Sequence, residues 1–297
     1  MNKALHYFLV FLSIIIFLVI LWHIDYQNLP PIYSKSNLFY SFLFLFGGFY
    51  FHILAWNKTL TYSQYNVSFS NSLQSIGLTI FGKYIPGKIW MIVGRAAYIA
   101  TLKKYNVGRL SILSLNAQFI ALWTGLLLGI IGLLVTNNLN TFLLIGVFII
   151  FILTALIFSP FLTTFIAKIS HKLFRKNFIL TPINFNKVIA LLPWYTTYWL
   201  LWSIGFYFLI CSFIPLHVPP LSALVFPLAS TFGIIAVFAP GGLGVREGLL
   251  TGHMLLFGFT FQQASVIAIV GRLWFLTGEI MIFLVALKAQ SIRPNKP

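Results

Sequence analysis

Residues 82–95 read GKYIPGKIWMIVGR and residues 239–250 read APGGLGVREGLL, and each stretch interrupts an otherwise apolar segment. The first lies within Leu73–Ala100 and the second within Leu221–Gly258. A Pro-Gly pair ends a helix, because proline removes a backbone donor and clashes with the preceding turn while glycine relaxes the chain. Each segment is therefore predicted to form two short helices that meet at a break. The helix-breaking residues are Pro86, Gly87, Pro240, Gly241, Gly242 and Gly244.

The remainder of the chain is too apolar and too poor in charge for a water-soluble protein. Of its 297 residues, 60% are hydrophobic and 7% are charged, whereas a soluble domain carries about 25% charged residues. Its only acids are Asp25, Glu247 and Glu279. This composition excludes a soluble enzyme, and the high apolar content excludes a disordered chain. The protein is expected to be solvated mainly by lipid.

Six apolar stretches are long enough to cross a membrane, which takes about 20 residues. They are Ala4–Trp22, Leu38–Ala55, Leu110–Val135, Thr141–Ala167, Val188–Phe213 and Phe261–Leu287. The first lacks a small-residue cleavage site, so it is predicted to be an uncleaved anchor. The sequence thus predicts an all-α polytopic membrane protein with about six spanning helices and two re-entrant helical hairpins. Residues 1–297 are expected to form a single integral membrane domain without a soluble catalytic domain.

Loop charges predict the orientation of these spans. Most of the 19 basic residues fall in one set of loops and in the two termini, while the opposite set of loops contains only Lys35. By the positive-inside rule, both termini are cytoplasmic. This orientation requires each broken segment to return to the side from which it enters. The halves 1–138 and 139–297 then have the same order of elements in opposite orientation, as in an inverted-topology repeat. The alternative is two unrelated helices with proline kinks.

Charged residues at membrane depth are the candidates for a substrate-binding site. Burying a charge there costs at least about 2.5–3.5 kcal/mol, and the basic residues outnumber the acids, so pairing within the protein cannot neutralise them. An anionic ligand would neutralise the excess positive charge. The candidates are Lys83, Lys88, Arg95, Arg246, Glu247, Arg272 and Glu279. The alternative is that the glycines only permit close helix packing and that the long Arg246 side chain extends to the membrane interface.

Local spacing adds further expectations. The glycine-rich turn before Arg246 would expose backbone N–H groups at a helix N-terminus, which suits phosphate. Adjacent Arg246 and Glu247 are expected to have different partners, whereas Arg272 and Glu279 share one helix face and could share a ligand. Two other sets are a polar stripe expected to line water and an aromatic run expected in an interfacial belt or in helix packing. They are Asn71, Ser75, Thr79 and Gly82, and Trp194, Tyr195, Tyr198, Trp199 and Trp202.

The two interrupted segments also resemble the paired signatures of the lysylphosphatidylglycerol synthase transmembrane-region family. This family is the flippase module of the bacterial multiple peptide resistance factor and also occurs as stand-alone membrane proteins. The resemblance implies a bacterial inner-membrane protein that moves aminoacylated or other phospholipids between leaflets. The positions that match the family's signatures, and to which the resemblance assigns a functional role, are Lys83, Pro86, Gly87, Arg95, Pro240, Gly241, Gly242, Gly244, Arg246 and Glu247. Because the sequence ends at Pro297 without an aminoacyl-transferase domain, lysyl transfer is not expected.

The leading hypothesis is a flippase or transporter for an anionic or aminoacylated phospholipid, or for a lipid-linked head group. The expected partners are membrane lipids, with a homo-oligomer or an envelope-biogenesis protein as further partners and no nucleic acid. One alternative is an accessory subunit of an envelope-lipid or glycan assembly complex. Another, a membrane-embedded transferase acting on lipid carriers, is disfavoured because no acid–histidine cluster is apparent. Scattered histidines and a single cysteine predict no metal, and no cofactor is expected.

Overall fold

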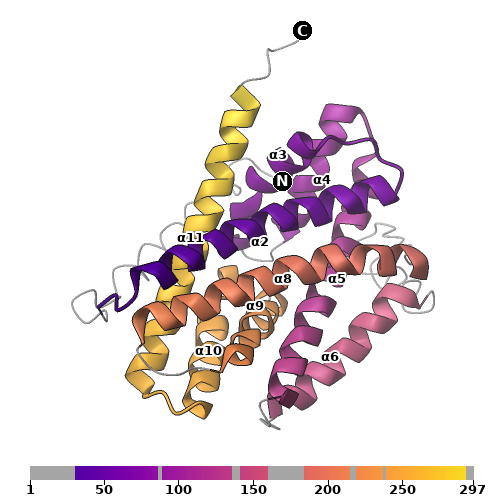
Figure 1. The fold of residues 1–297 in the computed structure, drawn as a ribbon. Helices are drawn as coiled ribbons and strands as arrows, with labels where there is room; N and C mark the ends of the chain where they lie inside the picture. Colours follow the sequence, from indigo (N-terminus) through magenta and orange to yellow (C-terminus); the bar gives the residue numbers. More distant parts are fainter. Residues whose placement is uncertain are drawn as a thin grey trace.

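The computed structural model of the chain describes residues 31–85, 89–135, 141–159, 184–214, 219–236 and 239–291, and all regular elements in these ranges are helices (Figure 1). The all-α prediction is confirmed. The elements are α2 (Lys35–Tyr62), α3 (Phe69–Gly77), η2 (Ile80–Tyr84), α4 (Ile89–Lys103), α5 (Val107–Val135), α6 (Thr141–Phe158), α8 (Phe185–Phe213), η3 (Pro220–Leu224), α9 (Val225–Ile235), η4 (Pro240–Gly242), α10 (Val245–Leu256) and α11 (Phe261–Ser291).

Four of the described helices, α2, α5, α8 and α11, are long and apolar enough to cross a membrane. Each has at least 28 residues and so exceeds the hydrocarbon thickness of about 30 Å. They contain the predicted spans Leu38–Ala55, Leu110–Val135, Val188–Phe213 and Phe261–Leu287. Helix α6 covers the start of the predicted span Thr141–Ala167, whose end lies outside the described residues, as does all of Ala4–Trp22.

The two interrupted segments form short helices, as the Pro-Gly pairs predict. Helices α3, α4, α9 and α10 have 9, 15, 11 and 12 residues. At 1.5 Å per residue, each is too short to cross about 30 Å of hydrocarbon alone. The first break contains Pro86, Gly87 and Lys88, which lie outside the described residues, and the second contains η4. The return of each segment to its side of entry stays a prediction.

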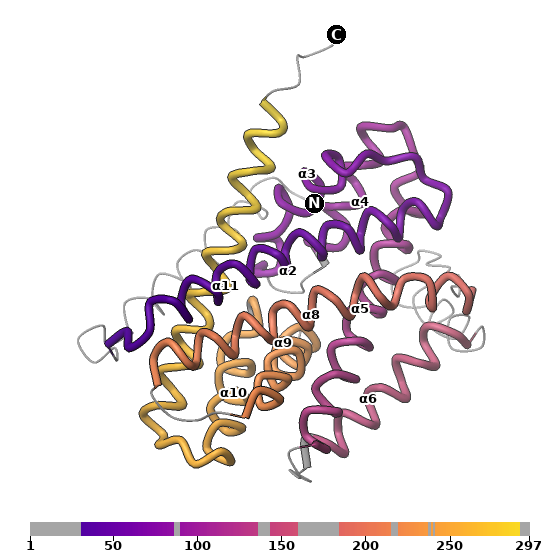
Figure 2. The backbone as a smooth tube through the Cα atoms, in the orientation of Figure 1, coloured from indigo at the N-terminus to yellow at the C-terminus, as the bar shows by residue number. Residues whose placement is uncertain are grey.

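Helices α2 and α8 lie side by side and antiparallel over most of their length (Figure 2). At one end, the Tyr33 backbone N–H donates to the Ser212 carbonyl oxygen at 2.9 Å. At the other end, the Thr59 and Tyr195 hydroxyl groups are 2.9 Å apart. The antiparallel pair is the geometry that an inverted repeat gives to equivalent helices of its two halves.

The remaining helices pack in a reciprocal pattern. Helices α4 and α10 pack against the spans that follow them, α5 and α11, whereas α3 and α9 cross to the other half and pack against α11 and α5. Gly77 and Gly129 allow these crossed contacts, because a Cβ at either residue would lie 2.5 Å from a side chain of the facing helix. The pattern agrees with an inverted repeat, and the boundaries 1–138 and 139–297 stay a prediction.

Candidate functional site

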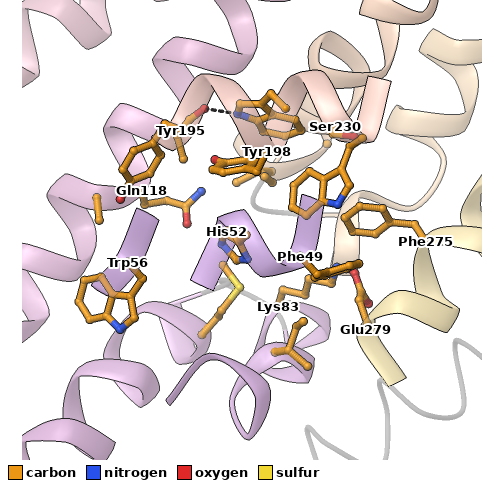
Figure 3. Close-up of a pocket in the computed structure, with 18 of the residues that line it drawn as sticks. Phe49, His52, Trp56, Lys83, Gln118, Tyr195, Tyr198, Ser230, Phe275 and Glu279 are labelled. Carbon is orange, nitrogen blue, oxygen red and sulfur yellow. Dashed lines mark hydrogen bonds and ion pairs between the residues drawn. The ribbon is translucent and has the colours of Figure 1, made fainter. Parts of the chain in front are cut away.

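A cavity of about 130 Å³ lies where the two interrupted segments meet the antiparallel helices (Figure 3). Residues of α2, η2, α4, α5, α8, α9, η4, α10 and α11 line it, so both halves of the chain contribute. It has room for several water molecules and suits a polar head group rather than a pair of acyl chains. Three basic side chains and one carboxylate line it: Lys83, Arg95, Arg246 and Glu279.

Arg95 is a buried guanidinium group held in place by a neutral residue and an aromatic ring. Its Nε donates to the Ser114 hydroxyl oxygen at 2.6 Å, and its Nη2 donates to the Ser114 carbonyl oxygen at 2.7 Å. The Ser114 hydroxyl in turn donates to the Ile92 carbonyl oxygen at 2.7 Å. The guanidinium carbon lies 4.5 Å from the centre of a Trp56 ring. No carboxylate of the described residues pairs with Arg95.

Arg246 comes from the second interrupted segment, in α10, and is as buried as Arg95, with 5% of its surface exposed. Its guanidinium carbon is 4.7 Å from the Phe226 ring centre and 5.0 Å from that of Phe275. Nη2 donates to the Gly271 carbonyl oxygen at 3.4 Å, and Nε has no hydrogen-bond partner among the described residues. The alternative in which Arg246 extends to the membrane interface is therefore wrong, because aromatic rings hold the group in the interior.

Lys83 and Glu279 form an ion pair that joins the first break to α11. The Tyr84 hydroxyl donates to the other carboxylate oxygen of Glu279 at 3.0 Å. Glu279 is 1% exposed and the Lys83 side chain is 21% exposed. Among the described residues, the one carboxylate that lines the cavity thus already has two partners.

A second ion pair, between Arg272 and Glu247, lies behind the cavity wall at the second break. Arg272 Nη1 is 3.4 Å from Glu247 Oε1 and donates to the Gly241 carbonyl oxygen at 2.9 Å. Glu247 Oε2 accepts the Gly244 backbone N–H at 2.8 Å. The carboxylate thus occupies the N-terminus of α10, where acidic groups are favoured. An acid of the same helix thus already accepts one N–H of this turn, and the expectation that the turn suits phosphate stays a prediction.

The structure brings four of the seven predicted charges to one cavity and places the others differently. Lys83, Arg95, Arg246 and Glu279 line it, and Lys88 lies outside the described residues. Arg246 and Glu247 have different partners, as expected. Arg272 and Glu279 form ion pairs with different residues, Glu247 and Lys83. Both also contact Tyr84, whose hydroxyl donates to Glu279 and whose ring centre lies 5.4 Å from the Arg272 guanidinium carbon. A common ligand for the two stays a prediction.

Sequence reasoning missed the aromatic wall of the cavity. Tyr195, Tyr198, Trp199 and Trp202 of α8 line it, whereas an interfacial belt or plain helix packing was expected. Their positions i, i+3, i+4 and i+7 on one helix face are the signal that could have identified them. His52, Trp56, Gln118 and Ser230 complete the polar and aromatic lining without any comparable pattern in the sequence.

The predicted polar stripe, which runs from α3 into η2, contributes to packing and does not line the cavity. The Ser75 hydroxyl accepts the Trp56 indole N–H at 3.1 Å and donates to the Ser72 carbonyl oxygen at 2.8 Å. The Thr79 hydroxyl donates to the Ser75 carbonyl oxygen at 2.7 Å. Among the stripe residues, Asn71 and Ser75 are buried, and none lines the cavity.

These features define a multi-pass helical membrane protein with two broken segments that meet at an internal cavity with excess positive charge. The sequence model of the lysylphosphatidylglycerol synthase transmembrane region matches residues 8–278, and the chain belongs to this family. No match was found among curated proteins or among solved structures. The family points to a lipid-related role in a membrane.

Proposed function

We propose that this protein moves lipids with an anionic head group across the bacterial inner membrane, with the head group in the cavity and the acyl chains in the surrounding lipid. The observation that carries the proposal is the pair of buried guanidinium groups, Arg95 and Arg246, for which the described residues offer no carboxylate. Buried charges are rare at membrane depth unless they are paired or functional. A phosphate group would supply the missing negative charge, and arginine binds phosphate through several N–H groups at once.

Both halves contribute to the binding site, which supports transport by alternating access. Arg95 comes from the first interrupted segment and Arg246 from the second. In inverted-repeat transporters, one half rocks against the other around a site at the repeat interface. By the positive-inside rule, both termini lie in the cytoplasm in this proposal. The proposed transport requires membrane lipids as the partners of the protein.

Lipid transport can be tested with the purified protein in liposomes that contain a fluorescent phosphatidylglycerol. Replacement of Arg95 or Arg246 with alanine is expected to slow the transfer of this lipid between leaflets at least tenfold, since hydrogen bonds to charged groups contribute about 1.5–3 kcal/mol. A dithionite-quenching assay measures the rate.

The matched control is Arg109→Ala, because Arg109 is exposed at the start of α5 and should leave the rate unchanged. Size-exclusion chromatography verifies that each variant is folded. Wild-type transfer rates in both cavity variants, or equal losses in the control, would contradict the proposed role of the arginines.

A further inference from the structure

The described part of the cavity has no carboxylate free to bind a positively charged head group. The whole chain has three acids, and Asp25 lies outside the described residues. Glu279 already binds the Lys83 ammonium group and the Tyr84 hydroxyl. Glu247 binds Arg272 and the Gly244 backbone N–H, and it does not line the cavity.

Aromatic rings could bind an ammonium group through cation–π contacts, but here the protein's own cations already lie over several of them. The Arg95 guanidinium covers Trp56, and Arg246 lies over Phe275. The Lys83 ammonium nitrogen is 5.3 Å from the Phe275 ring centre. An ammonium group beside these rings would therefore meet the guanidinium groups of Arg95 and Arg246, which have no carboxylate partner among the described residues, and the Lys83 ammonium group, which is paired with Glu279. Like-charge juxtapositions of this kind are a common means of rejecting a wrong ligand.

Other residues of the cavity lining suit neutral hydroxyl groups. Ser230 Oγ and His52 Nδ1 are buried atoms with no hydrogen-bond partner among the described residues, and both residues line the cavity together with Gln118 (Figure 3). The indole N–H groups of Trp199 and Trp202 donate to the Ala121 and Leu45 carbonyl oxygens. These two indoles therefore contribute apolar ring surface, and the unpaired polar atoms supply donors and acceptors.

We infer that the head group is a phosphate ester with a neutral hydroxylated substituent and that the cavity discriminates against head groups with a free ammonium group. The lipids that the cavity would reject include aminoacylated phospholipids, the class named in the description of the family. This inference rests on the proposed function and names the substrate class of the same site. The phosphate lies with Arg95 and Arg246, and the hydroxyl groups lie toward Ser230, His52 and Gln118.

The test compares three lipids that have identical labelled acyl chains in liposomes of one composition. Phosphatidylglycerol is anionic and hydroxylated, lysyl-phosphatidylglycerol has a net positive charge, and phosphatidylethanolamine is neutral overall but has an ammonium group. We expect phosphatidylglycerol to be transferred at least tenfold faster than either of the other two.

The outcomes separate this inference from the proposed function. If lysyl-phosphatidylglycerol or phosphatidylethanolamine moves as fast as phosphatidylglycerol, discrimination against ammonium is overturned while lipid transport stands. If none of the three moves faster than in protein-free liposomes, the proposed function itself fails.

A gain-of-function variant tests the same electrostatic argument. Ser230→Asp adds a carboxylate without a protein partner to the cavity lining and is expected to raise the ratio of lysyl-phosphatidylglycerol to phosphatidylglycerol transfer at least tenfold. Ser291→Asp, at the exposed end of α11, should leave this ratio unchanged. An unaltered ratio in folded Ser230→Asp protein would overturn the inference. If this variant does not fold, the comparison of the three lipids with the wild-type protein tests the inference by itself.

Discussion

Replacement of Glu279 with glutamine is expected to lower the free energy of unfolding by about 3–5 kcal/mol, because removal of one partner from a buried ion pair leaves the other charge uncompensated. The carboxylate is 1% exposed and binds both Lys83 and the Tyr84 hydroxyl. Its loss would place the Lys83 ammonium group beside Arg246 and Arg272 with no acid to offset it. The first break would also lose its ionic attachment to α11.

Thermal unfolding of the detergent-solubilised protein measures this effect. The double variant Lys83→Met/Glu279→Gln is expected to be more stable than Glu279→Gln alone, since it removes the unpaired ammonium group together with the acid. Lys288→Met removes an exposed charge from the end of α11 and should leave the transition temperature nearly unchanged. The single variant Lys83→Met completes the comparison. If the double variant loses as much stability as Lys83→Met and Glu279→Gln lose together, Lys83 and Glu279 do not stabilise each other.

The position of the breaks could be predicted from sequence, because the effect of a Pro-Gly pair on a helix is local. The ionic partners could not. Lys83 and Glu279 are 196 positions apart, and helical spacing identifies only which residues share a face. Arg272 and Glu279 share one, yet Arg272 pairs at η4 and Glu279 pairs at η2. Tertiary packing of α11 between the two breaks determines that difference.

Helical spacing shows that the aromatic residues share one face of α8, but for a related reason it does not show that this face lines the cavity. Tryptophan and tyrosine are favoured both at membrane interfaces and where a polar tip meets a buried partner, so residue type alone does not distinguish the two positions. The antiparallel packing of α8 on α2 turns Tyr198, Trp199 and Trp202 inward. That contact depends on both halves of the chain, and no window of local sequence contains it.

The contact between the two breaks leads to a second prediction, which concerns Gly241. This residue has a φ of +58°, and a Cβ there would lie 2.5 Å from Tyr84 Cε1 and 2.8 Å from Arg272 Nη2. A left-handed backbone costs a non-glycine residue about 1–2 kcal/mol, and overpacking adds about 1–3 kcal/mol. Gly241→Ala is therefore expected to lower the free energy of unfolding by about 2–5 kcal/mol. Displacement of Tyr84 would also weaken its hydrogen bond to Glu279.

Two neighbouring glycines separate the backbone contribution from the steric one. Gly244 has φ +79° and ψ −43° but open space around its Cβ position. Gly244→Ala should therefore show only the cost of this sparsely populated backbone conformation, about 1–3 kcal/mol. Gly248 is helical with open space, and Gly248→Ala should be neutral or stabilise the protein by about 0.4–1 kcal/mol. Thermal unfolding of the three variants should rank Gly241→Ala as the least stable and Gly248→Ala as the most stable. Equal stability of the Gly241 and Gly244 variants would mean that η2 and η4 can separate without cost, and the first break would then be free to move relative to the second.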